Sequence, residues 1–332
     1  MLKIAIVGLG VISHTHISCI RLSNKAKLVA VCDINPQKCE PFKDVPFFLN
    51  LDEMLASIDI DCVHICLPHF LHTEAIIKCA KAGVHVFTEK PLGISYKDCS
   101  TTFALEDEYS IKIGVCLQNR YNATTCKLKE ISKSEELGDF LGSKGIVTWS
   151  RTMDYYKASP WRGKLVEAGS GVMLNQSIHT LDLLAYLGGD FSSLNAKMTN
   201  FSLKELEIED SVMARLTYES SNLPSIYFAT IGYSTNSSVE IEMVFEHATF
   251  KIVDSKLYRY DDAGEVHFIC EDEKMPGSKH YYGASHLVAI EAFYDAILNN
   301  TSNYISVQDA SYSIKLIDAI KKSSENDTTI SL

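Results

Sequence analysis

The chain has 332 residues, of which 46% are hydrophobic and 22% charged, the composition of an ordinary globular protein with room for two domains. Its net charge of −11 and the lack of a dense Lys/Arg run argue against a nucleic-acid partner. No apolar run approaches the ~18 residues that a membrane-spanning helix needs, so no membrane partner is expected.

The N-terminus and the cysteines bear on location and on metal binding. Met1-Leu2-Lys3 leads directly into a short apolar run without the long apolar region and cleavage site of a signal peptide, so we expect a soluble, cytoplasmic protein. The ten cysteines include no Cys-x-x-Cys pair. We therefore predict free, mostly buried thiols and no metal site.

Short apolar runs alternate with helix-like stretches over the first part of the chain. Continuous apolar runs are typical of strands that are buried on both faces of a parallel sheet. The predicted strands are 2–7, 28–32, 62–67, 84–88 and 111–116, and the predicted helices are 11–23, 51–58, 71–82 and 96–109. This rhythm predicts an α/β fold, with a doubly wound Rossmann domain over residues 1–121.

A glycine turn follows the first predicted strand. Gly8-Leu9-Gly10-Val11-Ile12-Ser13 fits the dinucleotide fingerprint, except that Ser13 replaces its third small residue. The first glycine permits a tight turn and the second lets the backbone approach a pyrophosphate, which the helix N-terminus then holds. We therefore expect Gly8, Gly10, Val11 and Ile12 to contact the cofactor, although two glycines alone could be structural.

An acidic residue ends the second predicted strand. Asp33 lies 23 residues after Gly10, where a carboxylate can accept hydrogen bonds from ribose hydroxyls and would repel a 2′-phosphate. It predicts NAD as the cofactor in preference to NADP. The alternative is an aspartate that only caps a turn.

Glu89-Lys90-Pro91 follows the strand predicted at 84–88. Because functional residues of parallel sheets lie at the carboxyl ends of strands, Lys90 is expected on the cofactor edge, where Pro91 restricts the backbone beside it. A purely structural Lys-Pro turn is the alternative.

The second half of the chain changes pattern. Period-two alternation at 212–217 and 239–243, and a turn at 261–264 between 257–260 and 266–269, predict strands with one covered face. Helices are predicted at 171–187, 285–299 and 307–322. We expect residues 122–332 to form an α+β domain, built on a mostly antiparallel sheet, that binds substrate and mediates oligomerisation.

The segment from Gly169 to Asp182 carries a polar pattern. Asn175, His179 and Asp182 are spaced by four and three residues, so on one continuous helix they share a face that could point into a cleft. The alternative for a histidine on such a helix is a structural residue with its hydrogen bonds satisfied.

Together, these motifs resemble the Gfo/Idh/MocA oxidoreductases, the glucose-fructose oxidoreductase and inositol dehydrogenase group. The resemblance rests on the glycine turn, Asp33, Pro68-His69-Phe70-Leu71-His72, Glu89-Lys90-Pro91-Leu92 and the Gly169–Asp182 segment. It implies that Lys90 positions the reacting hydroxyl beside the nicotinamide and that His179 is the general acid/base. Family members usually carry an aspartate where this chain has Asn175, which cannot take a proton but can orient a hydroxyl.

The resemblance also distributes the remaining candidate residues between cofactor and substrate. Assigned to the cofactor, in addition to the glycine turn and Asp33, are Pro68, His72, Glu89, Lys90, Asn119, Trp161 and Arg162. Assigned to the substrate are Lys90, Tyr121, Asn175, His179, Tyr282 and His286, with Lys164 as a looser match. For His72 a helix start, and for the looser matches a solvated surface, are the alternatives.

The sequence thus predicts an NAD-dependent oxidoreductase that acts on a secondary hydroxyl of a sugar, cyclitol or sugar acid, which could be nucleotide-linked. His179 removes the hydroxyl proton while hydride passes to the nicotinamide. A sugar–sugar transhydrogenase with retained cofactor and a non-catalytic NAD-binding regulator are the alternatives. We expect a homodimer or homotetramer that pairs through the open sheet face.

Overall fold

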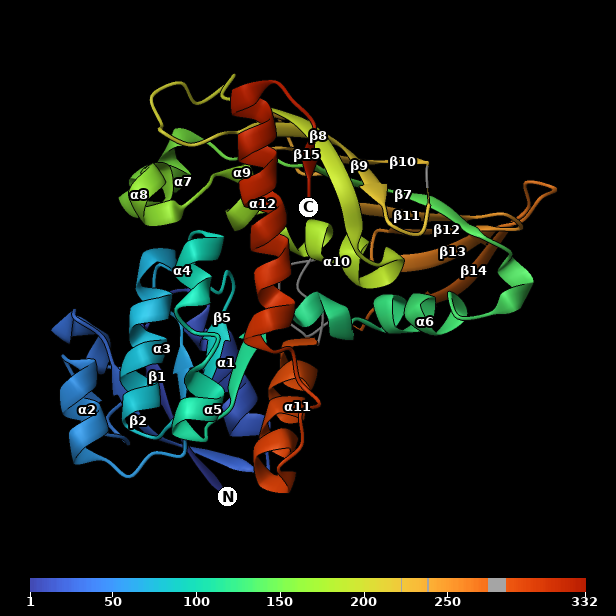
Figure 1. Cartoon of the computed structure of the whole chain (residues 1–332). Helices are drawn as coiled ribbons and strands as arrows, with labels where there is room; N and C mark the ends of the chain where they lie inside the picture. Colours follow the sequence, from blue (N-terminus) through green and yellow to red (C-terminus); the bar gives the residue numbers. More distant parts are fainter. Residues whose placement is uncertain (222, 238, 274–284) are drawn as a thin grey trace. The chain divides into compact units, whose positions relative to one another are not determined.

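The computed structural model describes residues 1–221, 223–237, 239–273 and 285–332. The chain forms two compact units (Figure 1). Unit 1 comprises Met1–Gln118 and Ser285–Ser311, and unit 2 comprises Asn119–Ala284 and Tyr312–Leu332. Each unit has its own sheet.

Unit 1 is built on a six-stranded sheet in the order β3-β2-β1-β4-β5-β6, with every neighbouring pair parallel. The strands are β1 (Leu2–Val7), β2 (Ala26–Cys32), β3 (Phe47–Phe48), β4 (Cys62–Ile65), β5 (His85–Glu89) and β6 (Ile113–Cys116). This is the doubly wound arrangement, so the predicted Rossmann fold is confirmed. The two-residue strand β3 was not predicted, because so short a pairing leaves no periodic pattern in the sequence.

Helices connect and cover these strands. They are α1 (Ser13–Leu22), α2 (Leu51–Ser57), α3 (His72–Lys81), α4 (Tyr96–Ser100), α5 (Leu105–Tyr109) and α11 (Ser285–Asn299). The single helix predicted over 96–109 is wrong, since α4 and α5 are separate. The hydroxyls of Thr101 and Thr102 donate to the carbonyls of Asp98 and Cys99, and such local side-chain bonds compete with helix continuation.

Unit 2 contains a nine-stranded sheet in the order β14-β13-β12-β11-β7-β10-β9-β8-β15. Its strands are β7 (Phe140–Thr148), β8 (Phe191–Thr199), β9 (Ser211–Tyr218), β10 (Pro224–Thr230), β11 (Glu240–Phe245), β12 (Thr249–Val253), β13 (Lys256–Tyr260), β14 (Val266–Glu271) and β15 (Ile330–Ser331). Only the β7–β10 pair is parallel among these described strands. The predicted mostly antiparallel sheet is confirmed.

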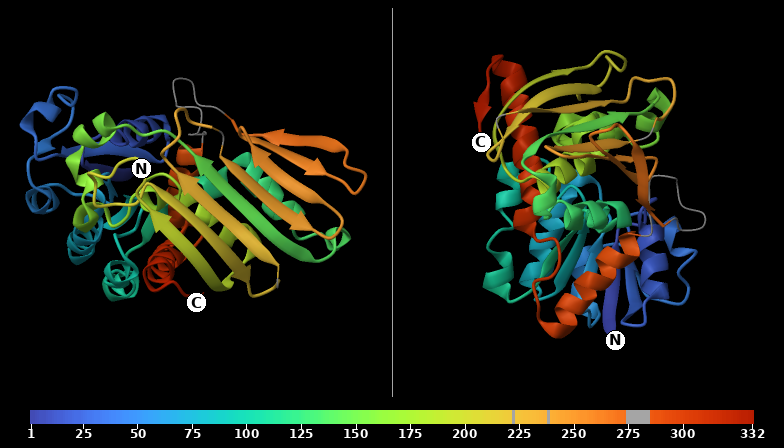
Figure 2. Two further views of the ribbon diagram at one scale, coloured as in Figure 1. Left: turned by 90° about the horizontal axis from the view of Figure 1, so that it is seen from above. Right: turned by 90° about the vertical axis from the view of Figure 1, so that its right-hand side faces the viewer.

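Helices lie on one face of this sheet, and the broad opposite face of its central strands carries none among the described residues (Figure 2, left). The helices of unit 2 are α6 (Ala123–Ile131), α7 (Met153–Lys157), α8 (Leu165–Ala168), α9 (Val172–Asn175), α10 (Ile178–Gly188) and the unit 2 part of α12 (Val307–Asn326). None of the helices in the described residues combines the length and apolar character that crossing a bilayer requires.

Close packing seats α10 on strand β7. A Cβ added to Gly145 would lie 2.8 Å from Thr180 Cγ2 and 2.9 Å from Leu184 Cδ1. Because a larger residue cannot fit there without displacing the helix, Gly145 lets α10 approach the sheet. The helix that carries His179 is thus held by the sheet core.

The continuous helix predicted over 171–187 is wrong. The chain ends α9 at Asn175 and restarts α10 at Ile178. Between them the Ser177 N–H and hydroxyl both donate to the Val172 carbonyl, at 2.9 Å each, and the hydroxyl contacts the Tyr227 hydroxyl at 2.5 Å. A side chain that bonds the backbone in this way closes one turn and prevents its continuation.

The cysteines follow the prediction of free thiols. None forms a disulfide, and seven are buried, among them Cys32, Cys66 and Cys116. They fill core positions as small apolar side chains.

Alternation along β9 generates the first testable prediction. Leu216 is fully buried whereas Met213, on the other face of the same strand, is 61% exposed. Leu216→Ala should lower the free energy of unfolding by about 2–5 kcal/mol because it leaves a cavity. The matched control Met213→Ala should change it by less than about 0.5 kcal/mol. Urea unfolding checks both, and equal losses would contradict the assigned faces.

Candidate active site

The glycine turn of unit 1 leaves room for a ligand. Gly8 has a φ of +88°, and a Cβ there would lie 2.5 Å from the Cys66 carbonyl oxygen, so only glycine fits. A Cβ at Gly10 would meet nothing within 4 Å. Val11 beyond it is 80% exposed. The turn therefore combines a forced backbone shape at Gly8 with open space at Gly10.

Asp33 is tied to this turn. Its Oδ2 accepts the Leu9 N–H at 2.7 Å and its Oδ1 accepts the Asn35 N–H at 2.8 Å. The carboxylate thus fixes Leu9, the residue between the two glycines, and its two oxygens retain acceptor capacity for further donors. Asp33 therefore holds the turn, as the structural alternative expected, and its free acceptor sites would also allow hydrogen bonds from ribose hydroxyls.

Lys90 follows β5 at the same edge of the sheet, because the carboxyl ends of parallel strands meet there. Its peptide bond to Pro91 is cis, and the side chain is half-buried. His72 supports this turn from α3: its Nδ1 lies 2.6 Å from the Pro91 carbonyl oxygen and its Nε2 2.8 Å from that of Leu67. Burial lowers the pKa of His72.

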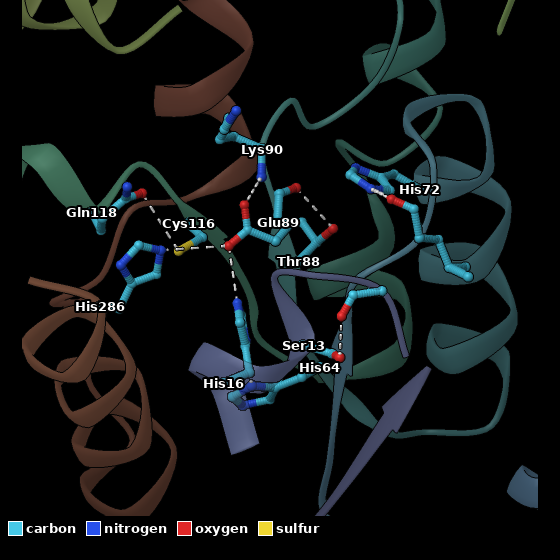
Figure 3. A network of polar contacts seen from close by, with 12 residues as sticks. Ser13, His16, His64, His72, Thr88, Glu89, Lys90, Cys116, Gln118 and His286 are labelled. Carbon is cyan, nitrogen blue, oxygen red and sulfur yellow. Dashed lines mark hydrogen bonds and ion pairs between the residues drawn. The ribbon is translucent and has the colours of Figure 1, made fainter. Parts of the chain in front are cut away.

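Glu89 lies beneath Lys90 and is buried (Figure 3). Its Oε1 is 2.9 Å from His16 Nε2 and 3.9 Å from His286 Nε2, and its Oε2 accepts the Lys90 backbone N–H at 3.3 Å. Burial lowers the pKa of His286 to about 4. The structure therefore places Glu89 and His286 in the core of unit 1, whereas we predicted them as cofactor and substrate contacts, and those roles stay predictions.

In unit 2, a buried carboxylate shapes the segment that carries Asn175 and His179. Glu209 accepts the Gly171 N–H at 2.8 Å, the Ser170 hydroxyl at 2.6 Å and the Met173 N–H at 3.1 Å. A Cβ at Gly171 would lie 1.9 Å from the Glu209 carbonyl oxygen, so glycine is required. A carboxylate that accepts amides at a helix start also suits the positive end of the helix dipole.

Asn175 belongs to an aromatic and cationic cluster. Its Nδ2 donates to the Tyr155 hydroxyl at 3.1 Å. The guanidinium groups of Arg162 and Arg151 lie 4.4 and 5.4 Å from the centre of the Tyr155 ring, and that of Arg151 lies 5.0 Å from the Trp149 ring. The arrangement gathers two cations and an amide around one phenol.

Asp182 does not share a polar helix face with Asn175 and His179. It is buried and accepts a bidentate pair from Arg120, Nε to Oδ2 at 2.9 Å and Nη2 to Oδ1 at 2.7 Å, and a bond from the Ser313 hydroxyl. The expectation that Asn175, His179 and Asp182 share one helix face that points into a cleft is wrong, because the helix is interrupted and Asp182 forms a buried ion pair with Arg120. Asn175 and His179 remain half-buried.

The other predicted residues are dispersed. Pro68 immediately precedes the turn of His69–Leu71 at the same edge as Lys90. Asn119, Tyr121 and Trp161 are half-buried in unit 2, and Lys164 is exposed and pairs with Glu167 at 2.7 Å. Tyr282 lies outside the described residues.

Sequence reasoning did not identify four residues that hold these segments: Tyr155, Glu209, His16 and His64. Tyr155 and Glu209 lie 20 and 34 residues from Asn175 along the chain and no local spacing links them. His16 follows Gly8 by eight positions, and its location on the first helix after the fingerprint was the one available signal.

Two protein-family models match the chain. Residues 2–116 match the oxidoreductase family with NAD-binding Rossmann fold, Gfo/Idh/MocA, and residues 125–251 match the GFO/IDH/MocA C-terminal domain. The chain belongs to the Gfo/Idh/MocA oxidoreductase family, as the sequence motifs predicted.

Individual relatives are more distant. The chain is 27% identical to the WlbA dehydrogenase from Bordetella pertussis, solved with NADH and UDP-GlcNAcA, with a TM-score of 0.89 over 100% of this chain and 97% of that one. It is 24% identical to the myo-inositol 2-dehydrogenase of Thermotoga maritima over 193 residues, 57% of this chain. It spans 55% of that curated relative's length.

Glu209 provides a test of how the Gly169–Asp182 segment is held. Glu209→Gln should lower the free energy of unfolding by about 1–3 kcal/mol, because an amide nitrogen would face donors that need an acceptor. Thermal or urea unfolding measures the loss, with exposed Glu205→Gln on the same loop as the matched control. Equal stability of the two variants would show that the Glu209 contacts contribute nothing.

Proposed function

We propose that this chain is an NAD-dependent oxidoreductase that transfers hydride between nicotinamide and a secondary hydroxyl of a sugar, cyclitol or sugar acid. The observation that carries the proposal is the shared sheet edge of unit 1. The glycine turn, Asp33 and Lys90 follow β1, β2 and β5 at that edge, where ligands bind in open α/β sheets.

The residues at this edge suit a dinucleotide. The open space at Gly10 leaves a path for a pyrophosphate toward the amides that precede α1. The exposed side chains of Val11 and Ile34, 80 and 90% accessible, offer apolar surface beside Asp33. The bound nicotinamide supplies the hydride acceptor or donor, and the chain supplies binding and orientation.

In the proposed reaction Lys90 and His179 act on the substrate hydroxyl. The Lys90 ammonium donates a hydrogen bond to the hydroxyl oxygen and thereby orients its carbon. His179 accepts the hydroxyl proton as general base during oxidation and returns it during reduction. Asn175 orients a hydroxyl through its amide, since it cannot exchange a proton.

The cluster around Tyr155 favours a negatively charged substrate. Arg151 and Arg162 stack on this ring. Arg151 donates to the Ser150 carbonyl and the Asn236 amide oxygen, and within the described residues no ion pair joins either guanidinium to a carboxylate. Two such cations beside Asn175 suit a carboxylate or phosphate. The likeness to a dehydrogenase solved with a UDP-linked sugar acid supports sugar acids, including nucleotide-linked ones, ahead of neutral sugars.

The proposal includes self-association. Residues 1–121 would bind the cofactor, and residues 122–332 would bind substrate and a second copy of the chain. Met213 on β9 and Ile226 on β10 expose apolar surface, and Val266 and Phe268 on β14 add to it. Along the register, Lys144, Glu242 and Lys251 lie between Ile226 and Phe268, so the face mixes apolar and charged side chains. Protein interfaces have this mixed composition, which supports a homodimer or homotetramer.

A substrate panel tests the activity. Sugars, inositols and sugar acids, including UDP-linked uronates, are incubated with NAD while absorbance of the reduced cofactor is followed. Lys90→Met should lower kcat/KM on the best substrate by about 10²–10⁴-fold, because the charged donor is lost while bulk is kept. NAD affinity, measured by calorimetry, should remain within a few-fold. A wild-type chain that binds NAD but turns over no member of the panel would support the regulator instead.

Asp33 tests the cofactor preference. Asp33→Asn keeps an acceptor for the Leu9 N–H and removes the charge that would repel a 2′-phosphate. The ratio of kcat/KM for NAD to that for NADP should fall by about tenfold or more. The exposed Asp44→Asn is the control. An unchanged ratio in Asp33→Asn would leave the carboxylate with its turn-holding role alone.

A further inference from the structure

A chain of hydrogen bonds runs through the core of unit 1 beneath Lys90 (Figure 3). Glu89 Oε1 lies 2.9 Å from His16 Nε2, His16 Nδ1 lies 2.9 Å from His64 Nδ1, and His64 Nε2 lies 3.0 Å from the Tyr294 hydroxyl. All four side chains are buried. They come from β5, α1, β4 and α11, so the chain connects four elements of the unit.

The contact between the two Nδ1 atoms restricts the protonation of this chain. One of the two nitrogens must carry a hydrogen and the other must accept it. If both imidazoles are neutral, His64 donates to His16 and accepts from Tyr294, and His16 donates its Nε2 hydrogen to Glu89. With one more proton, His16 is an imidazolium that donates to both Glu89 and His64, and His64 donates to Tyr294. The cluster therefore accommodates either charge without breaking a bond.

Electrostatics favour the protonated form of His16. Burial opposes a charged imidazole, but the surrounding Cys66, Cys116 and Glu89 raise the pKa of His16 well above its usual value. Burial, and then the charge of His16, lower the pKa of His64. Burial would raise the pKa of Glu89, yet its contacts with His16 hold it well below the usual range. A buried carboxylate that keeps its charge requires such a partner.

We propose that His16 and Glu89 form a buried charge pair that sets the electrostatic environment of Lys90. Both are positioning residues, since they lie in the core and act through Lys90. Glu89 holds the Lys90 backbone N–H, and its negative charge interacts with the charge of Lys90, while the His16 imidazolium balances the charge of Glu89. The consequence for turnover rests on the proposed function, whereas the charge of Lys90 can be measured without it.

The surroundings of the pair contain few other charges. Within the described residues, the titratable side chains that interact with the pair are Cys19, Cys62, Cys66, Cys116, His64, His72, His286, Tyr294 and Lys90. Burial raises the pKa of Cys19, Cys62, Cys116 and Tyr294 and so keeps them protonated, and it keeps His64, His72 and His286 neutral by lowering theirs. If His16 loses its positive charge, the negative charge of Glu89 is no longer balanced, and it stabilises the charged form of Lys90.

The first measurement is the protonation of His16 by ¹⁵N NMR of the imidazoles in the full chain. In the wild type both His16 nitrogens should remain protonated at pH 8, where an ordinary imidazole with a pKa near about 6.5 is neutral. In Glu89→Gln the ring should be neutral at the same pH. A neutral His16 in the wild type at pH 7 would overturn the proposal. His14 is exposed on the same helix. The control variant His14→Gln removes only the His14 imidazole signals and leaves the protonation of His16 unchanged.

The second measurement is the titration of the Lys90 side chain, followed by NMR of isotope-labelled lysine and assigned with Lys90→Met. His16→Gln keeps a donor for Glu89 but removes the positive charge, so the Lys90 midpoint should rise by about one pH unit. His16→Gln combined with Glu89→Gln removes both charges and should return the midpoint to within about 0.3 units of the wild type. A structural role alone would not produce this reversal.

Activity separates the two proposals. If the panel contains a substrate, the alkaline limb of kcat should move with the Lys90 midpoint in His16→Gln and return in the double variant. If Lys90 titrates as expected and no substrate is turned over, the proposed function fails and the charge pair stands. If turnover is found but the Lys90 midpoint is the same in His16→Gln as in the wild type, the charge pair is overturned and the proposed function stands.

Discussion

The Glu89 carboxylate is buried where β5 ends, and unit 1 has to satisfy it with protein groups. It does so with the His16 imidazole from the first helix and with the Lys90 amide. A buried charge without such donors would cost several kcal/mol, so the first helix, β5 and the Lys90 turn have to be positioned together. The glycine turn precedes that same helix. The position of the glycine turn is therefore coupled to the position of Lys90.

Unit 2 also contains buried carboxylates that need hydrogen-bond donors from the protein. Glu209 accepts hydrogen bonds from the Ser170 hydroxyl and from the Gly171 and Met173 amides. Asp182 accepts two hydrogen bonds from the Arg120 guanidinium. These two carboxylates hold the start of α9 and the first turns of α10. Asn175 and His179 lie between them, at the interruption of the helix. Rigid support on both sides suits residues that must present polar atoms in a fixed geometry.

The sequence was sufficient for the elements that depend on local patterns. The strands of unit 1, the alternation of β9 and the role of Gly8 in the turn follow from periodicity and from backbone sterics. The break at Ser177 and the burial of Asp182 could not be foreseen, because each depends on partners distant in the chain, Tyr227 and Arg120. The burial of Glu89 and His286 depends on distant partners in the same way, and their roles as ligand contacts stay predictions.

The replacement of the family's usual aspartate by Asn175 acquires a physical meaning from its neighbours. An aspartate at this position would accept the Tyr155 hydroxyl and add a negative charge next to the two guanidinium groups that stack on that ring. Asparagine donates to Tyr155 instead and leaves Arg151 and Arg162 without that internal counter-charge. Cations of this kind are stabilised when a ligand brings the missing negative charge. The change that removes a proton acceptor from the site therefore also strengthens the case for an acidic substrate.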